Sequence, residues 1–190
     1  MTYIELPLKN LDEMSEETCF LNDVLKEKKL AVVLGPPGSG KSSILEKYYR
    51  ENPNDSKFIT VREFLRSKFK LEKHIKVLLL DGLDEYRSAS NVDKISVTMD
   101  LADKISELEV DNTVLSCREL DWYGEADISA LRDAIGVNAS AYQILPLSED
   151  LQIKFAQLYK INNERFFIKK FTPYGFLENP QLFRMTVSAN

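Results

Sequence analysis

Short apolar runs alternate with longer amphipathic stretches along this chain, a pattern that is typical of a parallel sheet covered by helices. Leu30–Leu34 is a continuous apolar run and predicts a strand that is buried on both faces. Four more short runs predict the other strands of the sheet: Phe58–Val61, Lys76–Leu80, Thr113–Ser116 and Tyr142–Leu145. The hydrophobic pattern therefore predicts an α/β fold with a five-stranded sheet.

Helical periodicity appears in two further places. Six apolar residues recur at helical spacing and predict a long helix with one apolar stripe: Val92, Ile95, Met99, Ala102, Ile105 and Leu108. The pattern also changes after Pro146, where Ser148 can cap a new helix. That helix carries Leu151, Phe155 and Leu158 on one face.

These patterns divide the chain into three parts. We expect an N-terminal extension over residues 1–29, with a strand at Tyr3–Leu6 and a helix after it. An α/β core is expected over 30–146, and a helical domain begins over 147–190. Residues 186–190 carry no turn or capping signal, so we expect the helical domain to be truncated and the chain to be a fragment of a longer protein.

Composition and charge argue against several classes of function. The net charge is −5 and no dense basic block is present, so electrostatics give no reason to expect direct nucleic-acid binding. Two distant cysteines, Cys19 and Cys117, and the single His74 form neither a disulfide framework nor a metal cluster. The acidic N-terminus does not resemble a signal peptide, and runs such as Val77–Leu80 are far shorter than the roughly 20 residues that cross a bilayer. We expect a cytoplasmic protein without membrane contacts.

The strongest chemical signal is a phosphate-binding loop. Gly35–Ser42 reads GPPGSGKS and matches the pattern G-x-x-x-x-G-K-[ST]. A predicted strand precedes it and a helix is expected through Ser42–Arg50, as the pattern requires. Several backbone N–H groups must converge on polyphosphate oxygens, and Gly38 and Gly40 permit the unusual dihedrals and the close approach.

Two side chains of this loop have chemical roles of their own. Lys41 supplies a cation to the β- and γ-phosphates, and the Ser42 hydroxyl completes the coordination of Mg²⁺. The predicted cofactors are therefore ATP or ADP with Mg²⁺. The predicted nucleotide-binding residues are Gly35, Pro36, Pro37, Gly38, Ser39, Gly40, Lys41, Ser42 and Ser43.

A second motif is acidic. Val77–Glu85 reads VLLLDGLDE, in which four apolar residues lead to an aspartate at the end of a strand. Asp81 is therefore the second predicted magnesium ligand, usually through water. Gly82 follows it, where motor ATPases commonly have glutamate. The acidic pair comes later, and either Asp84 or Glu85 could orient or deprotonate the attacking water.

The next strand ends in Ser116–Arg118. In the additional-strand class of phosphate-loop proteins, this strand lies between the phosphate-loop strand and the Asp81 strand. A cation at the end of this strand could detect the γ-phosphate by binding its negative charge. This electrostatic interaction is strongest where water is excluded. The candidate catalytic residues are therefore Lys41, Asp84, Glu85 and Arg118.

Four segments together, GPPGSGKS, LLLDGLDE, VLSCR and FLENPQLFRM, resemble the NACHT group of STAND ATPases, the nucleotide switches of innate-immune and antiviral sensors. The resemblance covers Leu30–Met185. It implies a five-stranded parallel core in the order 5-1-4-3-2 and a helical domain that begins near Ser148. It also implies that Pro180, in the pair Asn179-Pro180, lies near the adenine base.

The same resemblance implies partners. Family members continue into a winged-helix domain that locks the ADP state and into a sensor domain, and neither is present here. Effector and sensor domains would then lie outside this segment, and self-association would follow ATP binding in the full-length protein.

Three functions are compatible with these motifs. A regulatory ATP/ADP switch with slow hydrolysis is preferred. The first alternative is an AAA+ motor or loader, but Gly82 in place of glutamate argues against it. The second is a scaffold that binds nucleotide without turnover, but the presence of Ser42, Asp81 and Glu85 argues against it. A small-molecule kinase lacks a lid-like arginine cluster, and a GTPase lacks an Asn-Lys-x-Asp guanine motif.

Overall fold

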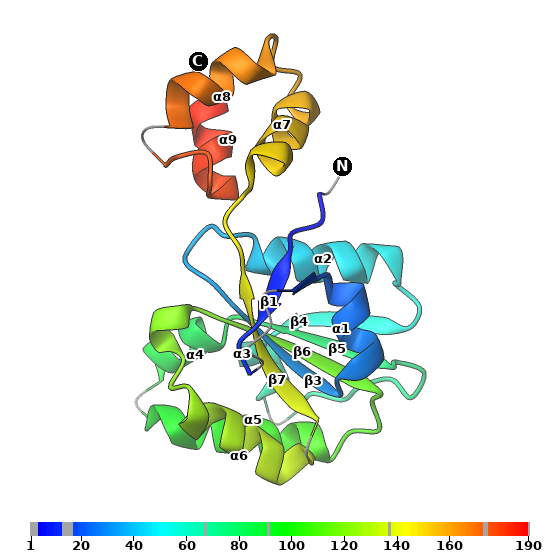
Figure 1. The fold of residues 1–190 in the computed structure, drawn as a ribbon. Helices are drawn as coiled ribbons and strands as arrows, with labels where there is room; N and C mark the ends of the chain where they lie inside the picture. The colour runs from blue at the N-terminus through cyan, green and yellow to red at the C-terminus, as the bar shows by residue number, and fades with distance from the viewer. Residues whose placement is uncertain are drawn as a thin grey trace.

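The computed structural model describes residues 4–12, 17–66, 68–90, 92–136, 138–172 and 175–189. They form an α/β core and a smaller helical lobe, connected through the segment between β7 and α7 (Figure 1). The strands are β1 Leu8–Asn10, β2 Thr18–Cys19, β3 Leu30–Leu34, β4 Ser56–Thr60, β5 Val77–Asp81, β6 Asn112–Cys117 and β7 Ala139–Ile144. The helices are α1 Leu21–Glu27, α2 Lys41–Glu51, α3 Val61–Phe64, α4 Leu83–Ala89, α5 Lys94–Ser106, the 3₁₀ helix η1 Glu119–Asp121, α6 Glu125–Ile135, α7 Glu149–Leu158, α8 Glu164–Phe171 and α9 Pro180–Ser188.

The sheet has seven strands in the order β2-β1-β7-β3-β6-β5-β4. Neighbours among β7, β3, β6, β5 and β4 pair in parallel, and these five strands, numbered among themselves in chain order, follow one another as 5-1-4-3-2. β1 pairs antiparallel with both β2 and β7. The sheet is therefore mixed, and it is two strands larger than the five-stranded parallel sheet that the sequence predicted.

The two added strands come from the N-terminal extension. β1 has three residues and β2 has two, so neither is long enough to show an alternating pattern in the sequence. Leu8 of β1 is fully buried and pairs with Ile144 of β7, which covers the edge of the parallel strands. The expected strand at Tyr3–Leu6 is not found: Tyr3 lies outside the described residues, and Ile4–Leu6 is irregular.

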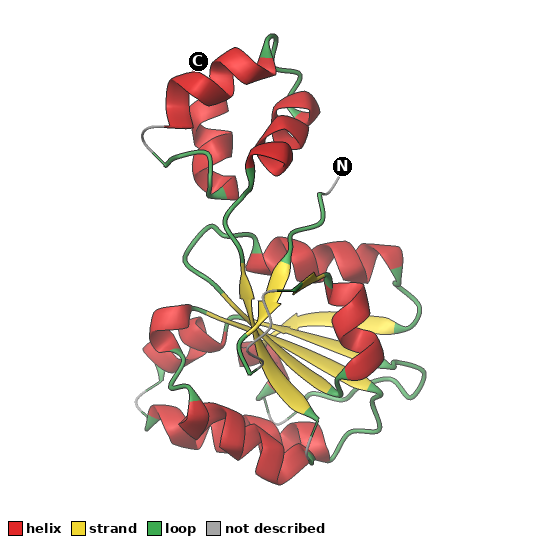
Figure 2. Cartoon of the chain, in the orientation of Figure 1, coloured by secondary structure: helices red, strands yellow, loops and turns green. Residues whose placement is uncertain are grey.

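Alternation along the central strands divides the core into two layers, as Figure 2 shows by the helices on either side of the sheet. Ala31 and Val33 of β3 pack in the layer that includes α1 and α2. Leu30, Val32 and Leu34 pack in the layer that includes α3, α4, α5 and α6. Because both faces are covered, the strand is apolar throughout rather than alternating, as the sequence predicted.

The apolar stripe predicted for α5 is only partly buried. Asp93 caps the helix through its carboxylate, so Val92 precedes the helix and is 53% exposed. Ile95 and Met99 are also exposed. The buried face consists of Val97, Thr98, Leu101, Ala102 and Ile105. Both the predicted set of residues, which begins at Val92, and the buried set, which begins at Val97, have helical spacing. Packing against the sheet buries the set that begins at Val97.

Aromatic rings form the centre of the helical lobe. Phe183 of α9 is fully buried, and its ring centroid lies 5.6 Å from that of Phe155 in α7 and 5.9 Å from that of Phe167 in α8. All three helices therefore contribute to one small core. The segment between β7 and α7 is also bonded to the lobe through the backbone, because Leu147 N–H donates to the carbonyl oxygen of Glu178 at 2.8 Å.

None of the helices in the described part of the chain has the length and hydropathy of a membrane span. The longest of them, α5, has 13 residues, whereas a span requires roughly 20.

Candidate nucleotide-binding site

The phosphate loop connects the carboxyl end of β3 to the first turn of α2. Gly38 and Gly40 have φ values of 74° and 99°, in the left-handed region that favours glycine. A Cβ on Gly40 would lie 2.5 Å from Leu6 Cδ1, and a Cβ on Gly38 would lie 2.7 Å from Gln181 Cβ. Both glycines are therefore required by the backbone conformation and by the close approach of other segments.

The start of α2 has the properties of an anion site. Its N-cap residue is Gly40, which offers no side-chain oxygen to the first N–H groups, and the first turn contains no acidic residue. These N–H groups have no intrahelical acceptor, and the helix dipole adds positive potential at the same end. Lys41, Ser42 and Ser43 form this first turn, so the loop and helix present converging donors to a phosphate.

Lys41 lies at the centre of the predicted residues. Its Nζ donates to the carbonyl oxygens of Gly35 at 2.7 Å and Pro36 at 3.0 Å. Burial lowers the pKa of Lys41 below its ordinary value; the carboxylate of Asp84 opposes this shift and the guanidinium of Arg118 adds to it. Asp81, Asp84 and Arg118, which are far apart in the sequence from Lys41, therefore all act on one ammonium group.

Asp81 is positioned by the strand beside it. β6 lies between β3 and β5, as expected for the additional-strand class, and brings Ser116 next to the end of β5. Ser116 Oγ donates to Asp81 Oδ1, and Gly82 N–H donates to Ser116 Oγ at 2.9 Å. The hydroxyl of Ser116 is buried in the sheet and orients the aspartate. The sequence did not indicate this role, because the two residues are 35 positions apart.

The two acidic residues of the second motif, Asp84 and Glu85, both lie in the first turn of α4 but differ in burial. Asp84 is only 4% exposed, and Arg118 binds it twice, through its backbone N–H at 3.1 Å and its Nε at 2.8 Å. Glu85 is exposed, and its Oε2 would lie 3.3 Å from a Cβ placed on Gly82. The two carboxylates therefore differ in access to water, although they are adjacent in the chain.

The side chains near the loop fit a magnesium ion held jointly with phosphates. Ser42 and Asp81 offer hard oxygen ligands, the type that Mg²⁺ prefers, and Mg²⁺ is usually bound by one or two protein groups together with phosphates and water. Within the described ranges, no group of three or more His, Cys, Asp and Glu residues could hold a metal by itself.

Cys117 is adjacent to this cluster but has a structural role. It is buried at the end of β6 beside Leu34 of β3. Burial raises the pKa of its thiol to about 12, so the side chain packs as a neutral group.

The helical lobe forms the other wall of the site. Asn179 Nδ2 donates to the carbonyl oxygen of Pro37 at 3.0 Å, and Gln181 N–H donates to that of Gly38 at 3.3 Å. Pro180 lies between them at the first position of α9, and its Cγ would lie 3.9 Å from a Cβ on Gly40. The N-terminus of α9 therefore contacts the phosphate loop directly.

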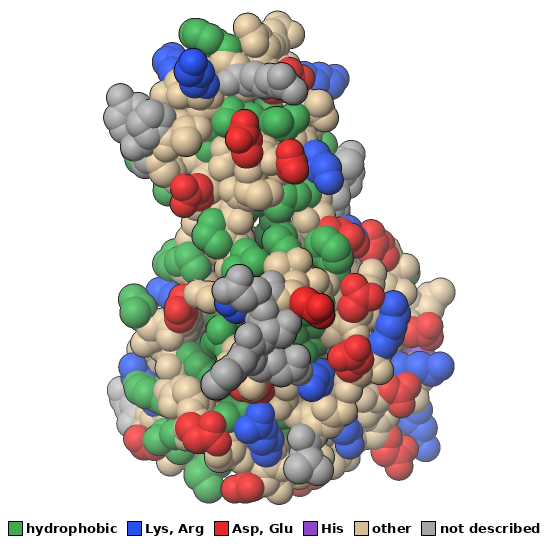
Figure 3. Space-filling model, in the orientation of Figure 1, with side chains coloured by type: hydrophobic (Ala, Val, Ile, Leu, Met, Phe, Trp, Pro, Cys, Tyr) green, Lys and Arg blue, Asp and Glu red, His purple; other side chains and the backbone are tan. Residues whose placement is uncertain are grey.

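A cleft of about 1820 Å³, including its open mouth, lies between the lobe and the core. Figure 3 shows the constriction at this junction, with hydrophobic side chains gathered along it. The cleft is lined by residues of the N-terminal segment, the loop, α2, α7 and α9. They are Ile4, Leu6, Gly38, Gly40, Lys41, Ser42, Ser43, Glu46, Arg50, Phe155, Leu158, Tyr159, Pro180, Gln181 and Arg184.

Several of these lining residues were not expected from the sequence. Tyr159, Gln181 and Arg184 reach the cleft only because the helical lobe lies against the loop. Arg184 is four positions after Pro180 in the same helix, so the two share a face. That spacing is the one signal in the sequence that could have identified Arg184.

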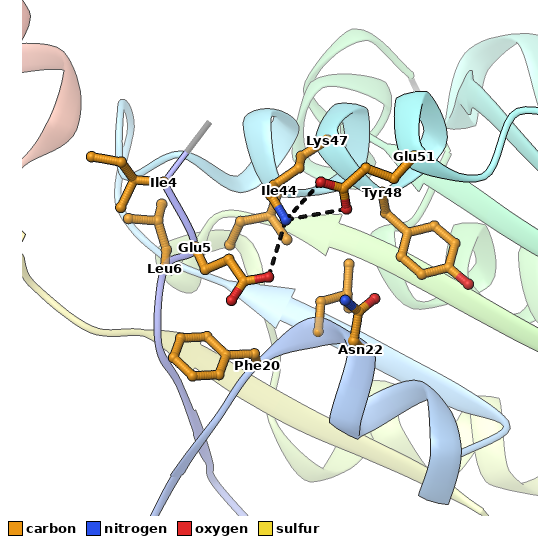
Figure 4. Close-up of a pocket in the computed structure, with 10 residues that line it drawn as sticks. Ile4, Glu5, Leu6, Phe20, Asn22, Ile44, Lys47, Tyr48 and Glu51 are labelled. Carbon is orange, nitrogen blue, oxygen red and sulfur yellow. Dashed lines mark hydrogen bonds and ion pairs between the residues drawn. The ribbon is translucent and has the colours of Figure 1, made fainter. Parts of the chain in front are cut away.

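The N-terminal segment is held beside α2 by charge. Lys47 Nζ lies 3.0 Å from Glu5 Oε1 and 3.1 Å from Glu51, and Figure 4 shows both carboxylates pointing at this ammonium. Burial opposes the charge on Lys47, but the hydrogen bonds to the two glutamates outweigh it and raise the pKa of Lys47. The interaction places Leu6 over Gly40 of the loop.

Comparison with known proteins identifies the fold. No family model and no curated protein sequence matches the chain. The structure is similar to that of a DNA replication initiation factor, with a TM-score of 0.56, 14% identity, and coverage of 88% of this chain and 56% of that one. It is also similar to a Walker-type ATPase of Pyrococcus abyssi, with a TM-score of 0.53, 12% identity, and coverage of 88% and 64%.

A third structure, the Aeropyrum pernix Orc1 protein in complex with DNA, matches less closely, with a TM-score of 0.44, 13% identity, and coverage of 73% and 45%. The chain spans less than two thirds of the length of each of these proteins. At such low identity the first two likenesses concern the fold alone. Together with the phosphate loop on β3 and Asp81 on β5, they show that this chain has the fold of a Walker-type P-loop ATPase.

Proposed function

We propose that this chain is the nucleotide-binding module of a NACHT/STAND-type signalling or antiviral-defence ATPase, in which Mg-ADP and Mg-ATP hold different states. One observation carries the proposal: the phosphate loop is bound on one side by the helical lobe and faces the ends of β5 and β6 on the other. Asn179 bonds to Pro37 of the loop, while Asp84 and Arg118 act on Lys41.

The loop residues bind the polyphosphate. The N–H groups at the start of α2 would bind phosphate oxygens, and the Lys41 ammonium, which here donates to the carbonyl oxygens of Gly35 and Pro36, would supply a cation to them. A magnesium ion held by Ser42 and Asp81 would supply charge neutralisation between the phosphates. Ser116 keeps Asp81 in position for this ligand.

The cleft between the N-terminal segment and the helical lobe would hold the base. Ile4, Leu6, Tyr159 and Pro180 give this cleft an apolar and aromatic lining. Planar purines are bound by such apolar surfaces, with specificity added by few polar groups. The sequence resemblance assigns this place to adenine.

The switch depends on the γ-phosphate, because no other group distinguishes ATP from ADP. A ligand shifts a conformational equilibrium only by its differential affinity for the two states. Arg118, which lies at the end of β6 and is 46% exposed, is the cation that would meet the γ-phosphate. The lobe responds through Asn179 and Gln181, since both bond to carbonyl oxygens of the loop that holds the phosphates.

Hydrolysis is slow in this proposal. Gly82, with φ of 82°, is the N-cap of α4, so the residue after Asp81 provides no carboxylate. Glu85 is the exposed acidic residue of the first turn of α4 and is the group that would orient the water. Slow turnover would return the ATP state to the ADP state.

Calorimetry with Mg-ADP and Mg-ATP tests the proposal. At a hundredfold excess over the dissociation constant, either nucleotide should raise the free energy of unfolding by about 2.7 kcal/mol. Lys41→Ala should abolish the heat of binding and the thermal shift. If the unmodified chain shows neither heat nor thermal shift with any adenine nucleotide, the proposal is wrong.

Steady-state turnover separates the switch from the motor or loader. A motor should hydrolyse ATP continuously at rates near the enzyme median of ~10 s⁻¹. A switch should hydrolyse far more slowly, and a scaffold should bind nucleotide with no turnover. In the full-length protein, the switch should also self-associate with ATP and not with ADP, which light scattering can measure.

A further inference from the structure

Two residues of α4 bind the segment that follows β6. Asp84 and Arg87 are three positions apart in α4, so they lie on the same face of the helix. Asp84 holds Arg118 and Arg87 holds Asp121, which are the ends of a four-residue segment. We call residues 118–121 the β6 exit segment.

The first contact occupies the carboxylate of Asp84. Its Oδ1 accepts the backbone N–H of Arg118 at 3.1 Å, and its Oδ2 lies 2.8 Å from Arg118 Nε. The side chain of Asp84 is 5% exposed, whereas that of Arg118 is 46% exposed. A general base needs an oxygen available to water. The carboxylate of Asp84 instead fixes the backbone and the guanidinium of one residue.

The second contact lies deeper in the molecule. Arg87 and Asp127 are both fully buried and form a bidentate ion pair, in which Arg87 Nη1 lies 3.0 Å from Asp127 Oδ2. The same Nη1 donates to the carbonyl oxygen of Asp121 at 2.6 Å. Buried bidentate pairs are geometrically specific. Arg87 therefore connects α4 to the end of the β6 exit segment and to α6.

We propose that Asp84 and Arg87 form a two-point clamp on the β6 exit segment, and that Asp84 is the positioning residue that directs the Arg118 guanidinium toward the γ-phosphate. This inference rests on the proposed function and goes further, because it separates the two adjacent acidic residues. Asp84 sets the preference for ATP over ADP, and Glu85 sets the rate of hydrolysis.

Electrostatics and topology support this division. α4 begins directly after Asp81 and Gly82, so a shift of α4 would move the metal-binding end of β5 and the cation at the end of β6 together. Leu34 of β3 is paired with Cys117 of β6, so the phosphate loop and Arg118 begin at adjacent strand ends, and the Asp84–Arg118 pair lies beside the loop. Glu85 is on the exposed side of the same helix turn.

A double-mutant cycle tests the clamp. The variants are Asp84→Asn, Arg118→Ala and the double variant, with Glu85→Gln as the control on the neighbouring carboxylate. We expect Asp84→Asn and Arg118→Ala each to reduce the ratio of ATP affinity to ADP affinity by about tenfold, and the double variant to reduce it by the same factor, because coupled residues are not additive. Glu85→Gln should keep the ratio and slow hydrolysis.

Two results would overturn the inference. If Asp84→Asn keeps the affinity ratio and stops hydrolysis, Asp84 is the catalytic base. If the double variant reduces the ratio by the product of the single effects, the two residues act independently.

Urea unfolding of the unmodified chain, the two single variants and the double variant, all without nucleotide, separates this inference from the proposed function. Coupling between Asp84→Asn and Arg118→Ala in the unfolding equilibrium shows that the contact exists even if the chain binds no nucleotide. Absence of nucleotide binding with coupling present would reject the proposed function and the γ-phosphate role, and leave the clamp. Additive unfolding effects would reject the Asp84–Arg118 contact, and with it the two-point clamp.

Discussion

The side-chain amide of Asn179 donates to the carbonyl oxygen of Pro37 across 142 positions of the chain, and so connects the helical lobe to the phosphate loop. Asn179 has a second role, because its Oδ1 accepts the N–H groups of Gln181 and Leu182 and caps α9. The same residue therefore starts a helix and binds the loop that we propose holds the phosphates. A mutation can therefore remove the amide donor that bonds to Pro37 and keep the oxygen acceptor that caps α9.

Asn179→Ser should retain the cap and lose the bond to Pro37, because serine caps helices well but lacks the amide donor. We expect the free energy of unfolding to change by less than about 0.5 kcal/mol and the affinity for nucleotide to fall several-fold. Asn179→Ala should lose both functions and cost about 1 kcal/mol more in stability. Calorimetric titration and urea unfolding measure the two effects. Equal nucleotide affinity in Asn179→Ser and the unmodified chain would contradict a coupling role.

Arg87→Met should destabilise the protein by about 3–5 kcal/mol, because it leaves the buried Asp127 carboxylate without its partner. Urea unfolding measures the loss. Arg62→Met is the matched control on an exposed arginine of α3 and should change stability by no more than ~0.5 kcal/mol. Replacing Asp127 with leucine in the Arg87→Met background should recover most of the loss, since no buried charge then remains. A small effect of Arg87→Met would show that the pair is not buried in solution.

Nucleotide affinity should fall with rising pH as Lys41 loses its proton. Burial lowers the pKa of Lys41, so this loss occurs below the ordinary lysine value of about 10.4. The sign follows from the phosphates, which bind the ammonium and not the neutral amine. In the free protein the effect on stability is opposite: the lowered pKa destabilises the folded state while Lys41 is charged, and stability is regained as pH rises between the folded pKa and the ordinary one.

Lys41→Arg is the control for this titration, because arginine stays charged throughout this range. We expect the affinity of the unmodified chain for Mg-ADP to fall at alkaline pH. The affinity of Lys41→Arg for Mg-ADP should stay constant over the same pH range, even if it is weaker throughout. Calorimetry across pH 7 to 10 makes the comparison. Parallel curves for the two proteins would assign the pH dependence to another group.

Gly40→Ala should abolish nucleotide binding. The residue has φ of 99°, so a Cβ strains the backbone of the loop, and that Cβ would lie 2.5 Å from Leu6 Cδ1, so the end of the Leu6 side chain must also shift. Gly136→Ala is the matched control, with φ of 87° and no heavy atom within 4 Å of the added Cβ. Both changes introduce backbone strain on the order of 1–3 kcal/mol, but only the first should affect thermal shifts with Mg-ADP. Loss of binding in both variants would indicate a global effect of destabilisation.

The sequence by itself determined the α/β class and the phosphate loop. The strands β3 and β5 appear as continuous apolar runs because both faces of the sheet are covered, and burial of this kind is visible in the sequence. The loop was recognisable because its donors belong to consecutive residues, Gly35–Ser42, and because the left-handed conformations at Gly38 and Gly40 require glycine.

Only the tertiary structure decided which partners each side chain meets. β1 and β2 are too short to leave a periodic signal, so their addition to the sheet was missed. Asp84 and Glu85 are equivalent in the sequence, and the ion pair with Arg118, 34 positions away, makes one buried and leaves the other exposed. Hydrogen bonds and ion pairs act over a few ångströms whatever the separation along the chain, so these contacts depend on how the strands and the helical lobe pack.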